Sequence, residues 1–181
     1  MPRPTKEEMS IDALCLSYGI QPPGVYHVTK YLCESVRKEY ATVVLPTIKM
    51  TLEETIKDKQ RARYELLCLM FNNDSDAITK QMVFVQSVVR APWLWDKISQ
   101  LLDLVAMYNE EDLGNLYRTI LIQSYFTDFP EPGWRLADMN SVGDSTLVYR
   151  KREAIKLFGI LMWKYCNDRE REDINKGVII R

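Results

Sequence analysis

Apolar residues recur at intervals of three and four along most of this chain, and that spacing constrains its fold more than any other feature. One segment carries Val28, Leu32 and Val36, and residues 94–108 repeat the same spacing. Such spacing places the apolar side chains on one face of a helix. No pair of alternating apolar and polar runs flanks an Asn-Gly or Asp-Gly turn, the signal of a β-hairpin. The pattern therefore predicts an all-α protein.

Capping and turn residues divide this pattern into separate helices. Thr5 and Glu8 have the spacing of a capping box, and Gly19 is a natural stop. The expected helices span residues 5–19, 25–45, 51–71, 76–90, 94–108, 109–121 and 147–166. Their short connections favour a single compact helical bundle of about six or seven helices, with one long loop near residues 127–145.

Length and composition indicate one folded domain. The chain has 181 residues, of which 46% are hydrophobic and 27% charged, and these are ordinary values for a globular protein. A chain of this length can bury a sizeable core. We expect a helical domain over residues 1–166 and a charged, flexible tail over residues 167–181, because the tail is almost devoid of apolar residues before its last few positions.

The chain shows no sign of membrane insertion or secretion. It has no run of about 20 apolar residues, the length that a membrane-spanning helix needs. Its first ten residues lack the apolar core of a signal peptide. The four cysteines have no CxxC spacing, which favours free thiols in a reducing compartment. We expect a soluble intracellular protein.

No catalytic, cofactor or metal signature is present in the sequence. The single histidine, His27, would have to serve any Cys–His or Ser–His arrangement, and no family-specific signature surrounds it. The seven glycines are scattered singly and form no phosphate-binding loop. No paired ligands have the spacing of a zinc site. We expect no metal, no cofactor and no enzymatic activity, although an enzyme with an unrecognised site stays an alternative.

The third expected helix contains cations where its apolar stripe should continue. Lys59 and Arg63 stand at these positions, and Lys57 and Arg61 lie beside them, so the four wrap around the helix. Burying an unpaired charge is costly. Two interpretations follow: a solvated stretch of helix with partners four residues away, or a surface that presents positive charge to phosphates.

The last expected helix combines a basic turn with a strongly apolar one. Its basic cluster consists of Arg150, Lys151, Arg152 and Lys156. The residues from 154 to 163 contain a single charge, so this stretch is apolar on more than one face. Such a helix is central in the fold or docks against another copy of the protein. We therefore predict self-association through Phe158, Leu161 and Met162.

The long loop contains a tryptophan beside a proline and a glycine. Because Trp134 has a large apolar body, we expect it to plug the bundle rather than to bind a ligand. Residues 134–139 fit a single helical turn, but the pattern does not define its ends.

The resulting hypothesis is a non-enzymatic helical interaction or assembly protein that self-associates through apolar helix surfaces. Its partner would be another protein or a second copy, forming a homo-oligomer. The alternative is a nucleic-acid-binding protein whose basic clusters on the third and last helices contact phosphates. Fold class by itself does not decide between them.

Overall fold

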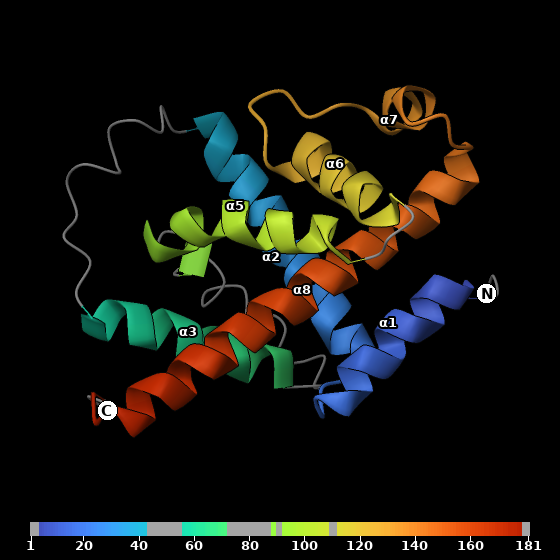
Figure 1. Cartoon of the computed structure of the whole chain (residues 1–181). Coiled ribbons are helices and arrows are strands. Elements are labelled where there is room, and N and C mark those ends of the chain that lie inside the picture. Colours follow the sequence, from blue (N-terminus) through green and yellow to red (C-terminus); the bar gives the residue numbers. More distant parts are fainter. Residues whose placement is uncertain (1–3, 43–55, 72–87, 90–91, 109–111, 179–181) are drawn as a thin grey trace.

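A single long helix, α8 (Asp144–Asn175), runs through the molecule and forms its axis (Figure 1). The computed structural model describes residues 4–42, 56–71, 88–89, 92–108 and 112–178. The other helices in these ranges are α1 (Lys6–Ser17), α2 (Pro22–Thr42), α3 (Ile56–Phe71), α5 (Pro92–Ala106), α6 (Leu113–Tyr125) and α7 (Gly133–Met139). Each of them contacts α8, and the described ranges contain no strand. The predicted all-α class and compact helical bundle are confirmed.

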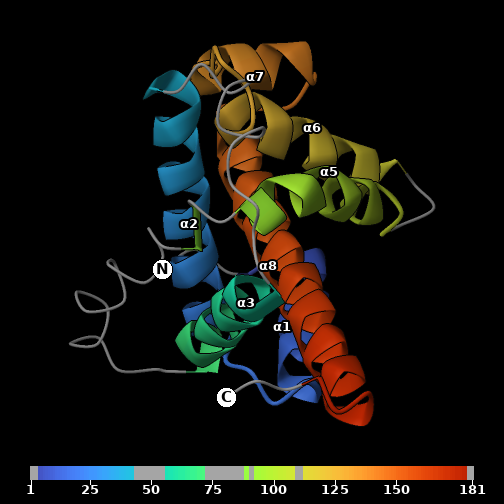
Figure 2. The same cartoon turned by 90° about the vertical axis from the view of Figure 1, so that its left-hand side faces the viewer.

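The helices surround α8 on several sides. In the view of Figure 2, α2 and α3 lie on one side of α8, whereas α5 and α6 lie next to each other on the other side. The short helix α7 covers one end of the molecule, next to α6 and the first turns of α8. The N-terminal helix α1 packs against α8 and α2.

Local signals set both ends of α1 as predicted. The Oγ1 of Thr5 accepts a hydrogen bond from the backbone N–H of Glu8 at 2.9 Å, which satisfies one of the free N–H groups of the first turn. Gly19 adopts a φ of 74°, a left-handed conformation that costs glycine little. Its N–H donates to the carbonyl of Leu16, and the N–H of Ile20 donates to that of Cys15. These two bonds form a Schellman motif, which ends the helix.

The last helix is longer than the periodicity of the sequence indicates. It begins at Asp144 rather than near Leu147, and it continues nine residues past Cys166, to Asn175. The segment expected to be a charged tail is therefore helical over residues 167–175, and residue 166 marks no end of an element. Asp173 is buried there, because α3 supplies cationic and amide partners for its carboxylate.

The expected long loop contains α7. Pro132 stands before its first residue in an extended conformation, and Gly133 begins the helix. Leu136 and Ala137 turn inward and pack with Ile120 and Leu147 in a small second core. The loop predicted near residues 127–145 is thus two connections around a short helix.

Two further expectations concern segments that lie wholly or mostly outside the described residues. The helix predicted over residues 76–90 lies outside them except for residues 88 and 89, and so does the predicted start of the third helix at Thr51. In the described ranges, no helix is both long and apolar enough to cross a membrane.

The main core lies along the middle of α8. Residues 153–160 of this helix are all buried, so its side chains meet neighbours in every direction. Phe158 and Met162 belong to this core. Gly159 lies where α2 crosses, and a Cβ atom added there would stand 2.1 Å from Thr29 Oγ1. Of the two alternatives for this apolar stretch, a central position in the fold or docking against another copy, the structure shows the central position.

Candidate functional site

The cations of α3 do not form one surface. Arg63 is buried and donates to Glu170 at 3.3 Å and to Asp173, both on the last turns of α8. Arg61 is exposed and pairs with Glu65 one turn later at 2.9 Å. Lys59 is half-buried, and the side chain of Lys57 is outside what the structure describes.

Arg63 is therefore buried at its core position because it is paired within the chain, an outcome that neither interpretation of the sequence predicted. Its charge is neither solvated nor presented to a partner, since carboxylates of the same chain neutralise it. Asp173 also accepts a hydrogen bond from Gln60 Nε2 at 3.2 Å. The signal in the sequence for this pairing is the acidic character of residues 167–175, a segment expected to be a flexible tail.

Three of the four predicted basic residues of α8 pair with carboxylates of α1. Lys156 is buried and donates to Glu8 at 2.8 Å and to Asp12 at 2.6 Å. Arg152 reaches the same carboxylate of Glu8 at 2.9 Å. Arg150 lies 3.5 Å from Glu7. These charges attach the N-terminal helix to the axis of the bundle, and an external phosphate would have to compete with them.

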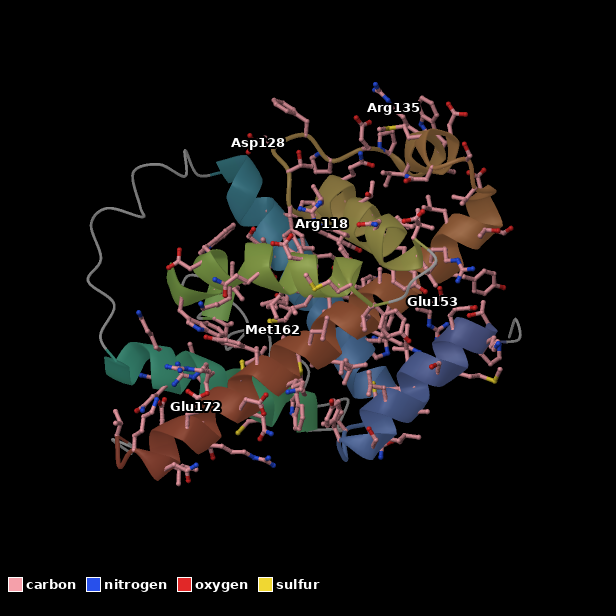
Figure 3. All side chains as sticks on the ribbon, viewed as in Figure 1. Arg118, Asp128, Arg135, Glu153, Met162 and Glu172 are labelled. Atoms are coloured by element: carbon pink, nitrogen blue, oxygen red, sulfur yellow. The ribbon has the colours of Figure 1, made fainter. Side chains whose placement is uncertain are left out.

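Glu153 is a buried carboxylate that the sequence analysis did not single out. Its oxygens accept hydrogen bonds from Thr5 Oγ1, from the hydroxyl of Tyr117 at 2.7 Å and from Arg150 at 2.9 Å. Figure 3 shows it where α8 passes between α6 and α1. Burial, together with the hydrogen bond to Glu153, raises the pKa of the Tyr117 hydroxyl above its ordinary value. Both oxygens are occupied by partners of the same chain, so the arrangement joins three elements.

Lys151 differs from the other cations of its cluster. Its Nζ lies 4.7 Å from the centroid of the Tyr125 ring, within the range of a cation–π contact. In the described ranges it has no ion-pair partner, unlike Arg150, Arg152 and Lys156. Burial lowers the pKa of its ammonium group, and the positive charge of Arg37 on α2 lowers it further.

The residues predicted to mediate self-association are mostly inside the core. Phe158 is 1% exposed and Met162 is 0% exposed, and only Leu161 is partly accessible. Figure 3 places Met162 in the middle of α8, among the surrounding helices. A second copy cannot contact Phe158 or Met162 while this fold is intact. The placement of a docking surface on these residues is therefore corrected: the chain's own helices already cover them.

Large apolar side chains are instead exposed around α7. Phe129 is 86% exposed, Trp134 68%, Met139 54% and Val148 67%, and we call these four residues the α7 surface. The expectation that Trp134 plugs the bundle is wrong, because Leu136 and Ala137 provide the inward face of the short helix. Asp128 and Arg135, labelled in Figure 3, lie at the same end of the molecule.

The groups that could support catalysis have other surroundings. His27 lies edge-on to the Tyr26 ring, and in the described part of the chain no hydrogen bond joins it to a cysteine or carboxylate. Burial raises the pKa of the Cys15 thiol to about 11 and raises the pKa values of Cys33 and Cys166 as well, which disfavours the reactive thiolate. Among the described residues, no group of three metal-ligating side chains comes together.

No protein-family model, no curated protein and no solved structure matches this chain. Its function therefore has to be argued from the chemistry of its surfaces.

Proposed function

We propose that this protein is a non-enzymatic helical interaction protein, and that it binds a protein partner through the α7 surface. The observation that supports this proposal is the exposure of four large apolar side chains within one segment of 20 residues, 129–148. Single exposed apolar residues are normal, but a group of them in one region is typical of interaction sites.

The residue types of the α7 surface fit this role. It contains a tryptophan and a phenylalanine, and buried aromatic anchors contribute most of the binding energy in many interfaces. Met139 adds a flexible apolar side chain, of the kind that adapts to different partner shapes. The small second core under α7 holds the helix in place, so its outward residues stand on an ordered support.

The charge around the α7 surface indicates the chemistry of the partner. Residues 128–148 contain the carboxylates Asp128, Glu131, Asp138 and Asp144 and a single cation, Arg135, which gives a net charge of −3. Arg135 pairs with Glu131 at 3.4 Å, so three carboxylates are left in excess. An apolar surface with an acidic rim is complementary to an apolar segment flanked by lysine or arginine.

A defined peptide tests this proposal. Fluorescence anisotropy would measure the affinity of a labelled amphipathic peptide of leucine and lysine, with a leucine–glutamate peptide as the charge control. We expect the first peptide to bind and the second to bind much more weakly. Replacing Phe129 and Trp134 together by alanine should weaken binding by at least about thirtyfold, the loss expected from a single interface anchor worth about 2 kcal/mol.

The matched control replaces Met9 and Leu16, two apolar side chains that are more than half exposed on α1. These alanine substitutions should leave the affinity unchanged. Equal binding by the Phe129 and Trp134 variant and the parent protein would overturn the proposal. Sedimentation equilibrium would show whether the parent protein is a dimer. A dimer that dissociates in the Phe129 and Trp134 variant would assign the surface to a second copy of this chain and would overturn the proposal of a basic partner.

A further inference from the structure

A second surface, on the seam between α2 and α8, gathers positive charge around tyrosine rings. Tyr26, Lys30, Glu34 and Arg37 follow one another at intervals of four, four and three residues, and therefore share one face of α2. From α8, Arg152 lies over the ring of Tyr26 on this face, and the adjacent Lys151 lies over the ring of Tyr125. Besides burial, the charges of Arg37 and Lys30 lower the pKa of Lys151.

Three cations at this seam lie over aromatic rings. Lys151 Nζ is 4.7 Å from the ring centroid of Tyr125, which ends α6. Lys30 Nζ is 6.0 Å from the ring centroid of Tyr26, and the guanidinium carbon of Arg152 is 5.5 Å from the same centroid. Such contacts hold cationic groups against a surface without neutralising their charge.

The positive charge of the seam exceeds the negative charge. Glu34 is the carboxylate on this face of α2, and it lies 3.9 Å from Lys30. In the described ranges, neither Arg37 nor Lys151 forms an ion pair. Lys30, Arg37 and Lys151 against Glu34 leave an excess of two positive charges, whereas Arg152 is already paired with Glu8.

Holding like charges together is unfavourable in the isolated protein. The lowered pKa of Lys151 reflects burial first and the charge of Arg37 next. Every other predicted basic residue of α8 has a carboxylate partner, as do Arg61 and Arg63. The chain thus neutralises these five cations itself, whereas Arg37 and Lys151 have no ion pair in the described ranges and can accept a counter-charge from outside.

We propose that Arg37 and Lys151, with Lys30 beside them, form a binding site for a phosphate group. A phosphate dianion supplies the two negative charges that the seam lacks. The fork of an arginine guanidinium matches two phosphate oxygens, and a lysine ammonium acts as a point charge for the third. This site is separate from the acidic α7 surface, and either can exist without the other.

Calorimetric titration with inorganic phosphate, against sodium chloride at the same ionic strength, tests the site. We expect saturable binding to the parent protein and at least a tenfold loss in the double variant Arg37→Gln, Lys151→Gln. The matched control is Lys164→Gln with Arg169→Gln, on the same helix, since both cations are at least partly exposed and already paired with acidic residues. This control should bind phosphate like the parent.

The unfolding temperature of the variants, measured without phosphate, gives a second test. Because Lys151 has a like-charged neighbour and no ion pair in the described ranges, the double variant should unfold at a temperature no lower than the parent does. If the double variant did not fold, the exposed Arg37→Gln alone should still weaken phosphate binding severalfold. No saturable phosphate binding, or equal binding in all variants, would overturn the proposal.

Two further titrations distinguish the source of the phosphate. Adenosine monophosphate represents a free phosphomonoester, and a short single-stranded oligonucleotide represents a phosphodiester backbone. Tighter oligonucleotide binding that weakens steeply with salt and is lost in the double variant would support the site with nucleic acid as its ligand. Equal or tighter binding of the monophosphate would support it with a small metabolite as its ligand.

Discussion

At the scale of single residues, the buried carboxylate of Glu153 shows how α8 determines the position of its neighbours. A buried carboxylate is tolerated only when hydrogen-bond donors surround it. Here the donors come from three places along the chain: Thr5, Tyr117 and Arg150. Removing the carboxylate would leave a buried hydroxyl and a guanidinium without this acceptor.

We predict that Glu153→Ala lowers the free energy of unfolding by about 3–5 kcal/mol, the usual cost of breaking a buried ion pair. Glu153→Gln should cost less, because its carbonyl oxygen still accepts from Tyr117. Urea denaturation measures both. The control Glu172→Ala removes half-exposed ion pairs with Arg169 and Lys176 and should cost less than about 1 kcal/mol. A similar loss for Glu153→Ala and Glu172→Ala would contradict the prediction.

Residue-scale features differ in how far they could be predicted. The cap at Thr5 was predictable because its partner, Glu8, lies three residues away. The pairing of Arg63 with Asp173 was not, since 110 residues separate them and their proximity depends on the packing of α3 against α8. A cation at a core position of the third helix is visible in the sequence, but its partner is not.

At the scale of helices, the close crossing of α2 and α8 depends on Gly159. Glycine inside a helix costs about 1 kcal/mol relative to alanine, so its presence here needs a reason. The reason is steric: a Cβ would lie 2.1 Å from Thr29 Oγ1 and 2.9 Å from Val25 Cγ1. The absence of a side chain allows the two backbones to approach.

We predict that Gly159→Ala destabilises the protein by about 1–3 kcal/mol, despite its higher helix propensity, because the added methyl group overpacks the crossing. Adding Thr29→Ala should recover part of this loss, which a double-mutant cycle in urea would measure. The control Gly133→Ala should be nearly neutral, since a Cβ there meets no atom within 4 Å. A neutral Gly159→Ala would show that the two helices are not constrained at this point.

At the scale of the whole molecule, the final turns of α8 belong to the fold. They extend beyond the apolar part of the helix, and charged contacts with α3 hold them. Arg63, Glu170 and Asp173 therefore connect the third helix to the end of the described chain. The predicted boundary between domain and tail at residue 166 therefore lies inside α8.

We predict that deleting residues 167–181 lowers the free energy of unfolding by about 3–5 kcal/mol, because it removes both carboxylates that pair with Arg63, which is buried in the intact chain. Adding Arg63→Met to the shortened chain should restore part of the stability, since an apolar side chain of similar length needs no partner. Thermal and urea unfolding would compare the two shortened chains with the parent. A shortened chain as stable as the parent would contradict the prediction.

The sequence by itself determined what depends on nearby residues: the helical class, the cap at Thr5 and the stop at Gly19. Tertiary structure alone decided which cations are neutralised, which apolar residues reach the surface and how far α8 extends. The physical reason is that periodicity acts over one or two turns, whereas the free energy of a charge or an apolar side chain depends on what packing brings next to it. Lys156 and Lys151, five residues apart, therefore have opposite surroundings: one is buried among carboxylates of α1, and the other lies over a tyrosine ring.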